Sequence, residues 1–416
     1  MSLKRISLLS ISGLVLCVMM VAYFKLAVLS GYYYGVSDFF KMYQSTLFYY
    51  SGQNIYSADN NLNTPFLLLF LLPFHVFNYA QASQVWNVIL ILSVLLGAYF
   101  ALRPFPQWHK NTLPLMALFS IYLPNSSTLA CGQITPILLV FLVFAWLLAR
   151  KGNDYSAGVL IGFLCALKLF FGLFLIYFLC LKRVRLVLTA LATMIMAFLI
   201  SVYVFGLQSF VSYHTVLHHI TWYASSWNAS FYGFFTRLFS NAEGNVPVVV
   251  APYFTTIFTV LCSVVLMVCL IGLWIKWGRQ KFDNGFSLVI VSMLLLSPLG
   301  WVYYFPLLLI PYVVLVEEGN TWTHLAACFL LLMSTQTSGI LVPNQINTMK
   351  QIFMWGGLGF YVLLGLLGLL CLVSYGVRRS EKYAISENLW CVIYIVIFVP
   401  SLISLGAIFR GIMACH

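Results

Sequence analysis

Long apolar runs, separated by short polar or basic loops, recur along the whole chain. A helix needs about 20 apolar residues to cross a bilayer. Runs of roughly this length occupy residues 6–29, 82–102, 133–149, 186–206, 250–275, 322–342, 353–375 and 389–409. The pattern therefore predicts an all-α, polytopic membrane protein.

Other apolar segments are too short to cross in this way. Residues 152–181 lie between two basic clusters, so one span would put a basic cluster outside, and two full spans need about 40 residues. We therefore predict two half-helices that meet near Lys168. Residues 65–79 and 113–124 are also short. Broken helices are tolerated at membrane depth where protein buries them or a wet cavity adjoins them, so these segments indicate an internal site.

The charge distribution supports this topology. Only 7% of the residues are charged, against about 25% in soluble domains, and 62% are hydrophobic. The net charge of +12 comes from short basic clusters between apolar runs, the pattern that keeps Lys and Arg cytoplasmic. We infer that the partner is the lipid bilayer and not nucleic acid. Residues 30–64, 207–249 and 297–304 are then expected on the external side.

Acidic residues are scarce, so candidates for acid–base chemistry can be found by elimination. Six of the 9 fall in loops expected to be cytoplasmic: Asp154, Asp283, Glu317, Glu318, Glu381 and Glu387. Asp38, Asp59 and Glu243 remain outside. Asp38 lies close to a helix end among aromatic residues, where partial desolvation favours a general base. An interfacial Asp that caps a short helix beside a membrane aromatic belt explains the same pattern, and both interpretations stay open.

Basic residues in apolar or external segments are candidate anion ligands. A lysine such as Lys168, with apolar neighbours on both sides, costs roughly 2.5–3.5 kcal/mol at the membrane centre, which favours a role such as binding a lipid phosphate. The alternative is that it reaches the interface. His214 and His218 share a helix face and could bind zinc, but no acidic or Cys ligand is near. Phosphate contact or an interfacial location is the favoured interpretation for these two and His219.

Several short motifs occur in an order that is similar to one known family. Asp38 precedes a Tyr-rich segment with a Pro-Phe pair, and further matches follow along the chain. The matching residues are Tyr49, Tyr50, Gly52, Tyr56, Pro65, Phe66, Trp86, Gly132, Gln133, Lys168, Asn228, Ser230, Arg237, Ser297, Pro298 and Trp301. Over residues 25 to about 315 the chain resembles glycosyltransferase family 87, the polyprenyl-phosphate-mannose-dependent mannosyltransferases of the GT-C superfamily.

The resemblance implies a fold and a location. We expect a GT-C-type bundle of about 10–13 transmembrane or half-membrane helices in one domain, residues 1–416. Residues 1–315 would form the catalytic part and 316–416 additional helices. The protein would lie in the cytoplasmic membrane of a prokaryote, with its active site on the non-cytoplasmic face.

The resemblance also implies roles for individual residues. The enzyme would move a sugar, mannose in the family pattern, from a polyprenyl-phosphate donor to a glycan or lipid acceptor with inversion, using no metal or other cofactor. Asp38 would be the general base. The donor phosphate would be bound by Lys168, Arg237, His218 and His219, and the sugar or acceptor by Gln133, Asn228, Trp301, Tyr303, Tyr304 and Asp59.

Two departures leave the sugar open. The family often has a histidine after the tryptophan where this chain has Tyr303 and Tyr304, and a proline after the lysine where it has Leu169. A transporter or flippase of a lipid-linked saccharide would also use half-helices and an intramembrane lysine. A polymerase or ligase of O-antigen type would need a much larger external loop.

Overall fold

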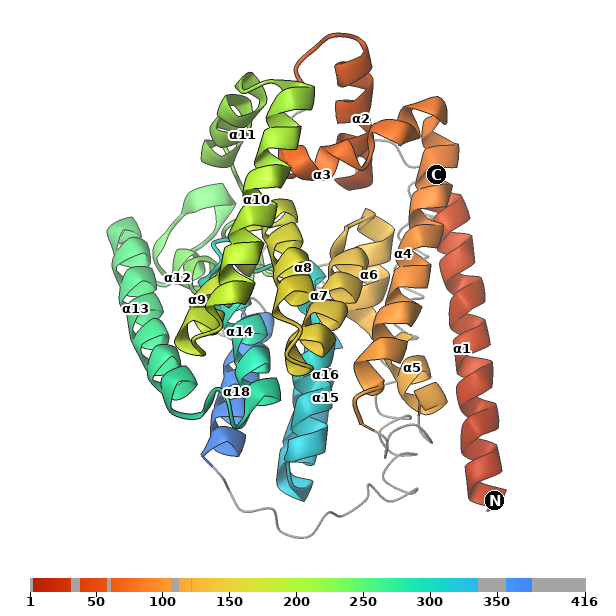
Figure 1. Cartoon of the computed structure of the whole chain (residues 1–416), viewed down its shortest axis with the longest axis vertical. Helices are drawn as coiled ribbons and strands as arrows, with labels where there is room; N and C mark the ends of the chain where they lie inside the picture. The colour runs from red at the N-terminus through yellow and green to blue at the C-terminus, as the bar shows by residue number, and fades with distance from the viewer. Residues whose placement is uncertain are drawn as a thin grey trace. The chain divides into compact units, whose positions relative to one another are not determined.

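The computed structural model describes residues 3–30, 38–57, 61–105, 112–120, 122–335 and 357–375 (Figure 1). Within these ranges the chain forms 17 α-helices and four short 3-10 helices, and no strand. The predicted all-α class is confirmed.

The chain divides into two compact units. Unit 1 comprises Met1–Met20, Leu95–Ser127 and Trp222–His416, and unit 2 comprises Val21–Val94 and Thr128–Thr221. The expected single domain stays a prediction.

The helix lengths and compositions are those of a multi-pass membrane protein. Three described helices are long and apolar enough to span a bilayer: α4 (Tyr79–Leu102), α10 (Val184–Phe205) and α13 (Pro252–Trp277). Seven shorter apolar helices accompany them. Only 11% of the most apolar window of α13 is buried. In water such a surface would be strongly unfavourable, whereas in a bilayer it faces lipid.

Most of the predicted spans correspond to observed helices. Besides the three long ones, the matching helices are α1 (Leu3–Ser30), α7 (Thr135–Arg150), α16 (Thr321–Thr335) and α18 (Leu358–Ser374). The predicted span at 389–409 lies outside the described residues.

Unit 2 contains the predicted pair of half-helices. α8 (Asp154–Leu167) ends at Lys168, whose backbone is extended (φ −146°, ψ 116°). The 3-10 helix η3 (Leu169–Gly172) and α9 (Leu173–Cys180) follow. The segment 65–79 is likewise broken, into α3 (Pro65–Leu69) and η1 (Leu72–Val76). Both breaks agree with the sequence prediction.

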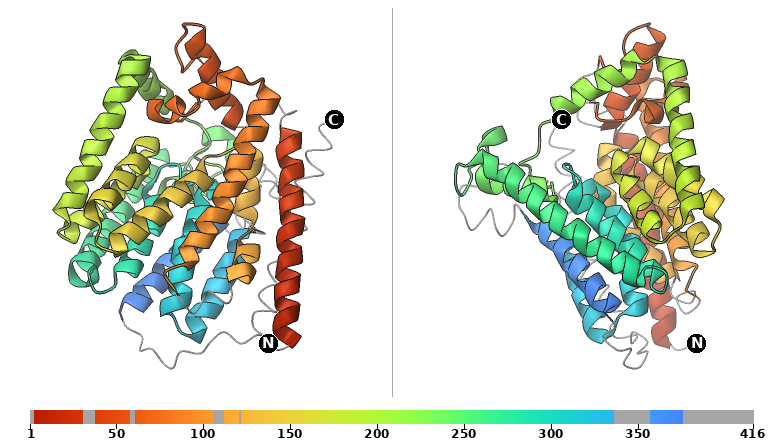
Figure 2. Two further views of the ribbon diagram at one scale, coloured as in Figure 1. Left: turned by 45° about the vertical axis from the view of Figure 1, so that its right-hand side comes forward. Right: turned by 60° about the vertical axis from the view of Figure 1, so that its left-hand side comes forward.

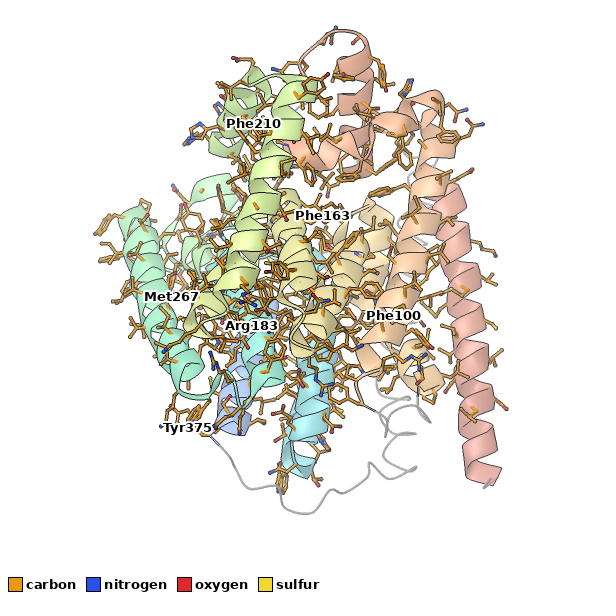
Figure 3. The ribbon with its side chains drawn as sticks, in the orientation of Figure 1. Phe100, Phe163, Arg183, Phe210, Met267 and Tyr375 are labelled. Atoms are coloured by element: carbon orange, nitrogen blue, oxygen red, sulfur yellow. The ribbon has the colours of Figure 1, made fainter. Side chains whose placement is uncertain are left out.

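α8 and α10 pack very closely along their lengths. Gly158 and Gly162 on α8 lie against the α10 backbone, and a Cβ added at Gly162 would lie 2.3 Å from the carbonyl oxygen of Ala190. At the start of both helices, Arg183 donates to Asp154 (Nε–Oδ1 2.8 Å) and to the carbonyl of Ala149 (2.7 Å). Figure 3 labels Arg183 at this end of α10.

Three short helices of unit 2 lie at the other end of α10. These are α2 (Asp38–Tyr50), α3 and α11 (Gln208–His218), which Figure 1 shows together above the start of α10. Because α8 has 14 residues and rises about 1.5 Å per residue, Lys168 lies about 21 Å from the Arg183 end. Lys168 is therefore on the side of the unit where α2 and α3 lie.

Unit 1 is built around the buried helix α14 (Phe282–Leu296), whose side chains from Asn284 to Leu295 are all buried. Figure 2 shows α13 and α14 side by side, and α18 and α15 (Leu309–Glu318) also pack on α14. α14 ends at Leu296, just before the Ser297-Pro298 pair, because proline cannot continue a helix. The chain then continues through Trp301 into the 3-10 helix η5 (Val302–Leu308). The other described elements are α5 (Thr112–Ser120), α12 (Phe231–Phe239), the 3-10 helix η4 (Ala242–Gly244) and α6 (Leu123–Cys131), which begins in unit 1 and continues into unit 2.

Candidate functional site

Asp38 is the first residue of α2 and carries a partly exposed carboxylate. Its side chain is 31% exposed, and the Lys41 ammonium lies 3.7 Å from Oδ1 on the same face of the helix. The Gln133 side-chain amide donates to the other oxygen, Oδ2. One carboxylate oxygen is therefore next to a cation, while the other is fixed by a hydrogen bond.

The start of α2 and the turn that carries Gln133 are also connected through Trp86. Phe39, which is buried, stacks on Trp86 (centroids 5.3 Å apart, planes at 16°). The Trp86 indole N–H donates to the carbonyl of Gly132 over 2.8 Å. Gly132 has a positive φ of 67°, which glycine adopts without strain, and it forms the turn between α6 and α7. The start of α2 and the turn before α7 are therefore connected twice. Asp38 contacts Gln133 directly, and the adjacent residues Phe39 and Gly132 are linked through Trp86. These contacts fix the Asp38 carboxylate in place.

Lys168 is oriented by two asparagines from the loop between α2 and α3. Its ammonium donates to Asn63 Oδ1 over 2.9 Å. Asn63 Nδ2 donates to Asn61 Oδ1 (2.9 Å), and Asn61 Nδ2 donates to Ser45 Oγ on α2 (2.7 Å). This chain of hydrogen bonds links the lysine at the helix break to the helix that begins with Asp38.

The loop that carries these asparagines is itself fixed on the end of α8. Thr64 Oγ1 accepts from the N–H of Leu67 and so caps α3, and it donates to the carbonyl of Ala166 (2.8 Å). The Tyr56 hydroxyl donates to the carbonyl of Asn63 over 2.6 Å. Asn63 is therefore held by its backbone as well as its side chain.

Two opposing influences act on the Asp38 carboxyl. Partial burial raises its pKa and outweighs the ammonium groups of Lys41 and Lys168 and the Gln133 hydrogen bond, which lower it, so the pKa lies above its ordinary value. A carboxylate with a raised pKa is a stronger base and can take a proton from a hydroxyl group. When Asp38 is ionised, the two ammonium groups leave the group of residues with one net positive charge, which suits a singly charged anion such as a phosphodiester.

In unit 1 the segment that begins at Asn228 contacts the segment from Pro298 to Trp301. Asn228 pairs with Trp301 in an isolated antiparallel bridge, and Asn228 Nδ2 donates to the carbonyl of Pro298 over 2.9 Å. Ser230 Oγ donates to the same carbonyl (3.1 Å). Arg237 Nη1 donates to the carbonyl oxygens of Ser225 (2.7 Å) and Asn228 (2.9 Å). Arg237 thus holds the loop that precedes α12.

Two donors in this group remain for other partners. Within the described part of the chain, Arg237 Nη2 and Trp301 Nε1 are buried and have no hydrogen-bond partner. The Trp301 ring lies 6.4 Å from those of Trp222 and Tyr303, while Tyr304 is buried. The group combines aromatic rings with buried donors, a composition that suits a sugar.

The structure therefore separates the predicted site residues into two groups. Asp38, Gln133 and Lys168 meet in unit 2, and Asn228, Arg237 and Trp301 meet in unit 1. His218 and His219 are exposed at the end of α11. Asp59 lies outside the described residues.

Sequence reasoning missed three residues of unit 2: Lys41, Asn61 and Asn63. The spacing of Lys41, three residues after Asp38 at a helix start, is a signal that could have identified it. The two asparagines belong to a polar run, Asn60 to Thr64, between a short helix and an apolar segment. That run is equally typical of an ordinary loop, so only their contacts distinguish them.

Comparison with known proteins gives one match. The family model described as Glycosyltransferase family 87 matches residues 61–298, which is more than half of the chain. The matched range includes Gln133, Lys168, Asn228 and Arg237, and Asp38 precedes it. No curated protein and no solved structure matches the chain.

Proposed function

Because the chain belongs to glycosyltransferase family 87, we propose that this multi-pass membrane glycosyltransferase uses Asp38 as its general base. The donor is a polyprenyl-phosphate sugar, with mannose as the sugar, and the acceptor is a glycan or glycolipid. The observation that carries the proposal is the partly exposed Asp38 carboxylate, which is fixed by Gln133 and lies beside two ammonium groups.

The reaction is a single displacement. The acceptor hydroxyl oxygen attacks the anomeric carbon as Asp38 takes its proton, and the bond between that carbon and the phosphate oxygen breaks. Polyprenyl phosphate leaves with the bonding electron pair, and the proton passes from Asp38 to solvent. Attack opposite the leaving group inverts the anomeric configuration, so a β-linked donor gives an α-linkage.

The cations stabilise the negative charge that develops on the departing phosphate. Lys168 and Lys41 both interact electrostatically with the Asp38 carboxyl, so both would also attract an anion bound beside Asp38. Preorganised cations in a site that excludes water act most strongly where charge develops. An alkyl phosphate needs little protonation to leave, so a second carboxylic acid is not required.

For unit 1 we assign contact with the sugar or acceptor to Trp301 and Tyr303, because aromatic rings recognise sugars. The Asn228 amide is buried and donates to the carbonyls of Tyr223 and Pro298, so a substrate role for it, as for Gln133, stays a prediction from the sequence. Arg237 Nη2 is buried and has no hydrogen-bond partner among the described residues, and its binding of the donor phosphate also stays a prediction from the sequence. Tyr304 and Asp59, and the phosphate role of His218 and His219, stay predictions from the sequence.

The active site lies on the non-cytoplasmic face in this proposal. α2 and α3 are at the opposite end of α10 from the basic residues Lys182, Arg183 and Arg185. Basic clusters of short loops stay in the cytoplasm. The basic end of α10 is then cytoplasmic, which puts Asp38 on the other face.

The test is transfer by the purified protein with a panel of polyprenyl-phosphate sugars, followed as release of polyprenyl phosphate. Asp38→Asn should lower turnover by about 10²- to 10⁴-fold, the contribution of general base catalysis, with unchanged thermal unfolding. Glu317→Gln, at the end of α15, is the matched control and should keep wild-type turnover.

Two results would overturn the proposal. One is wild-type turnover in Asp38→Asn. The other is no release from any donor combined with movement of a lipid-linked saccharide across vesicles, which would identify the protein as a flippase.

A further inference from the structure

α11 carries a pair of histidines outside the group formed by Asp38, Gln133 and Lys168. His214 and His218 are four residues apart, so they share one face of the helix, and both are exposed. The flanking residues fix the helix on its other side. Ser212 Oγ accepts from Asn54 Nδ2 (2.7 Å), and the Tyr213 ring lies 5.6 Å from that of Tyr56. The histidines therefore project into solvent from a helix that is held in place.

The two imidazole rings converge on one point. His214 Nε2 and His218 Nε2 are 3.2 Å apart, and the ring centroids are 4.4 Å apart with the planes at 71°. In a tetrahedral zinc site with Zn–N bonds of 2.0–2.1 Å, two nitrogen ligands lie about 3.3–3.4 Å apart. The spacing of this pair is thus close to that of two ligands of one metal ion.

We propose that His214 and His218 form a binding site for a divalent transition metal ion such as Zn²⁺. Imidazole nitrogen is a preferred ligand of zinc, copper and nickel, and the helix sets the separation of the two nitrogens before the metal arrives. Both Nε2 atoms give their lone pairs to the metal, whereas a direct hydrogen bond between the rings uses the lone pair of only one. A metal ion therefore satisfies the pair more completely.

The site leaves coordination positions open. Among the described residues, no group of three or more His, Cys, Asp or Glu side chains is arranged around one metal position. Water or an anionic oxygen would complete the coordination, as in zinc sites that keep a free position. The site therefore belongs to the open, exchangeable kind, with a lower affinity than a closed four-ligand site.

Metal binding by the full chain tests this proposal. The protein is purified in detergent without a polyhistidine tag and titrated with Zn²⁺ alone by calorimetry. We expect about one equivalent in the wild type, since two linked ligands bind about 10²-fold or more tightly than one. His214→Ala and His218→Ala should each lose this binding. His219→Ala should keep it, because His219 is an exposed neighbour outside the pair.

The exposed thiols Cys17 and Cys269 are present in every variant, so their contribution cancels in the comparison. Zn²⁺ should also raise the unfolding temperature of the wild type and of His219→Ala, but not that of the other two. If either alanine variant is less stable, His214→Gln and His218→Gln replace it.

Three results would overturn the proposal. They are wild-type protein that binds no Zn²⁺, equal binding in the wild type and His214→Ala, and loss of binding in His219→Ala. Because the readout is metal binding, the result does not depend on whether the protein transfers a sugar.

Discussion

Lys168, the residue at the break between α8 and η3, donates a 2.9 Å hydrogen bond through its ammonium to the side-chain oxygen of Asn63. The break itself creates the opportunity for this bond. In a continuous helix the lysine would be one more residue on an apolar surface, whereas the extended backbone at Lys168 directs it toward the α2–α3 loop. A cation that costs several kcal/mol in lipid is stabilised here by a neutral partner. It therefore keeps its positive charge available for a ligand.

The first prediction concerns the orientation of the Lys168 side chain. Asn63→Ala removes the acceptor, and a catalytic group misplaced by about 1 Å costs up to 10²-fold, so we expect kcat to fall about 10- to 10²-fold. Asn63→Asp should lower kcat further than Asn63→Ala, because the new carboxylate would pair with the Lys168 ammonium and hold it away from the phosphate. Gln53→Ala, which changes an exposed residue earlier in the same loop, is the control. A smaller loss in Asn63→Asp than in Asn63→Ala would contradict the positioning role.

The second prediction is a pH dependence. A base must be ionised to act, so activity should fall as the pH drops through the pKa of Asp38. Lys41 is the largest of the influences that lower this pKa. Lys41→Met removes it and therefore raises the pKa, which moves the acid limb of the kcat/KM profile to higher pH. Lys41→Arg keeps the charge and should leave the limb near its wild-type position. An unchanged limb in Lys41→Met would show that another group controls the profile.

The third prediction concerns Gln133. Its amide donates to Asp38, so Gln133→Leu removes the donor and lets the carboxylate move. Gln133→Glu places a second carboxylate against the first, and two such groups cannot both be ionised easily. At neutral pH we expect Gln133→Glu to have lower activity than Gln133→Leu. When the pH is raised, the activity of Gln133→Glu should recover less than the activity of Lys41→Met. Gln53→Glu, on an exposed turn, is the control for the added charge.

The fourth prediction concerns the fold of unit 2. A Cβ at Gly162 would lie 2.3 Å from the Ala190 carbonyl oxygen and 2.7 Å from the Thr193 Cβ, so α8 and α10 would have to separate. Overpacking of this kind costs typically 1–3 kcal/mol. Gly162→Ala should therefore lower the unfolding temperature in detergent. Gly172→Ala, where nothing lies within 4 Å of the added Cβ, is the matched control and should have little effect. Equal stability of the two variants would mean that the helices are not packed this closely.

Much of the fold could be predicted because membrane insertion is governed by local composition. The helix break at Lys168 follows from counting residues between Arg150 and Lys182, and the end of α14 follows from Pro298. Each conclusion uses residues that are close in sequence and a bilayer thickness that is constant. The division into two units could not be predicted in this way, since it depends on how distant helices pack together.

The helical class, the membrane location and the unusual positions of the charged residues Asp38 and Lys168 can all be read from the order of apolar and charged residues. The partners of these two residues depend on the three-dimensional packing. Gln133 is 95 positions from Asp38, and Asn63 is 105 from Lys168. No periodicity connects residues so far apart, because their contact depends on how the helices between them turn and pack. A charge scarce enough to be noticed can be identified from the sequence, but its neighbours are fixed by packing.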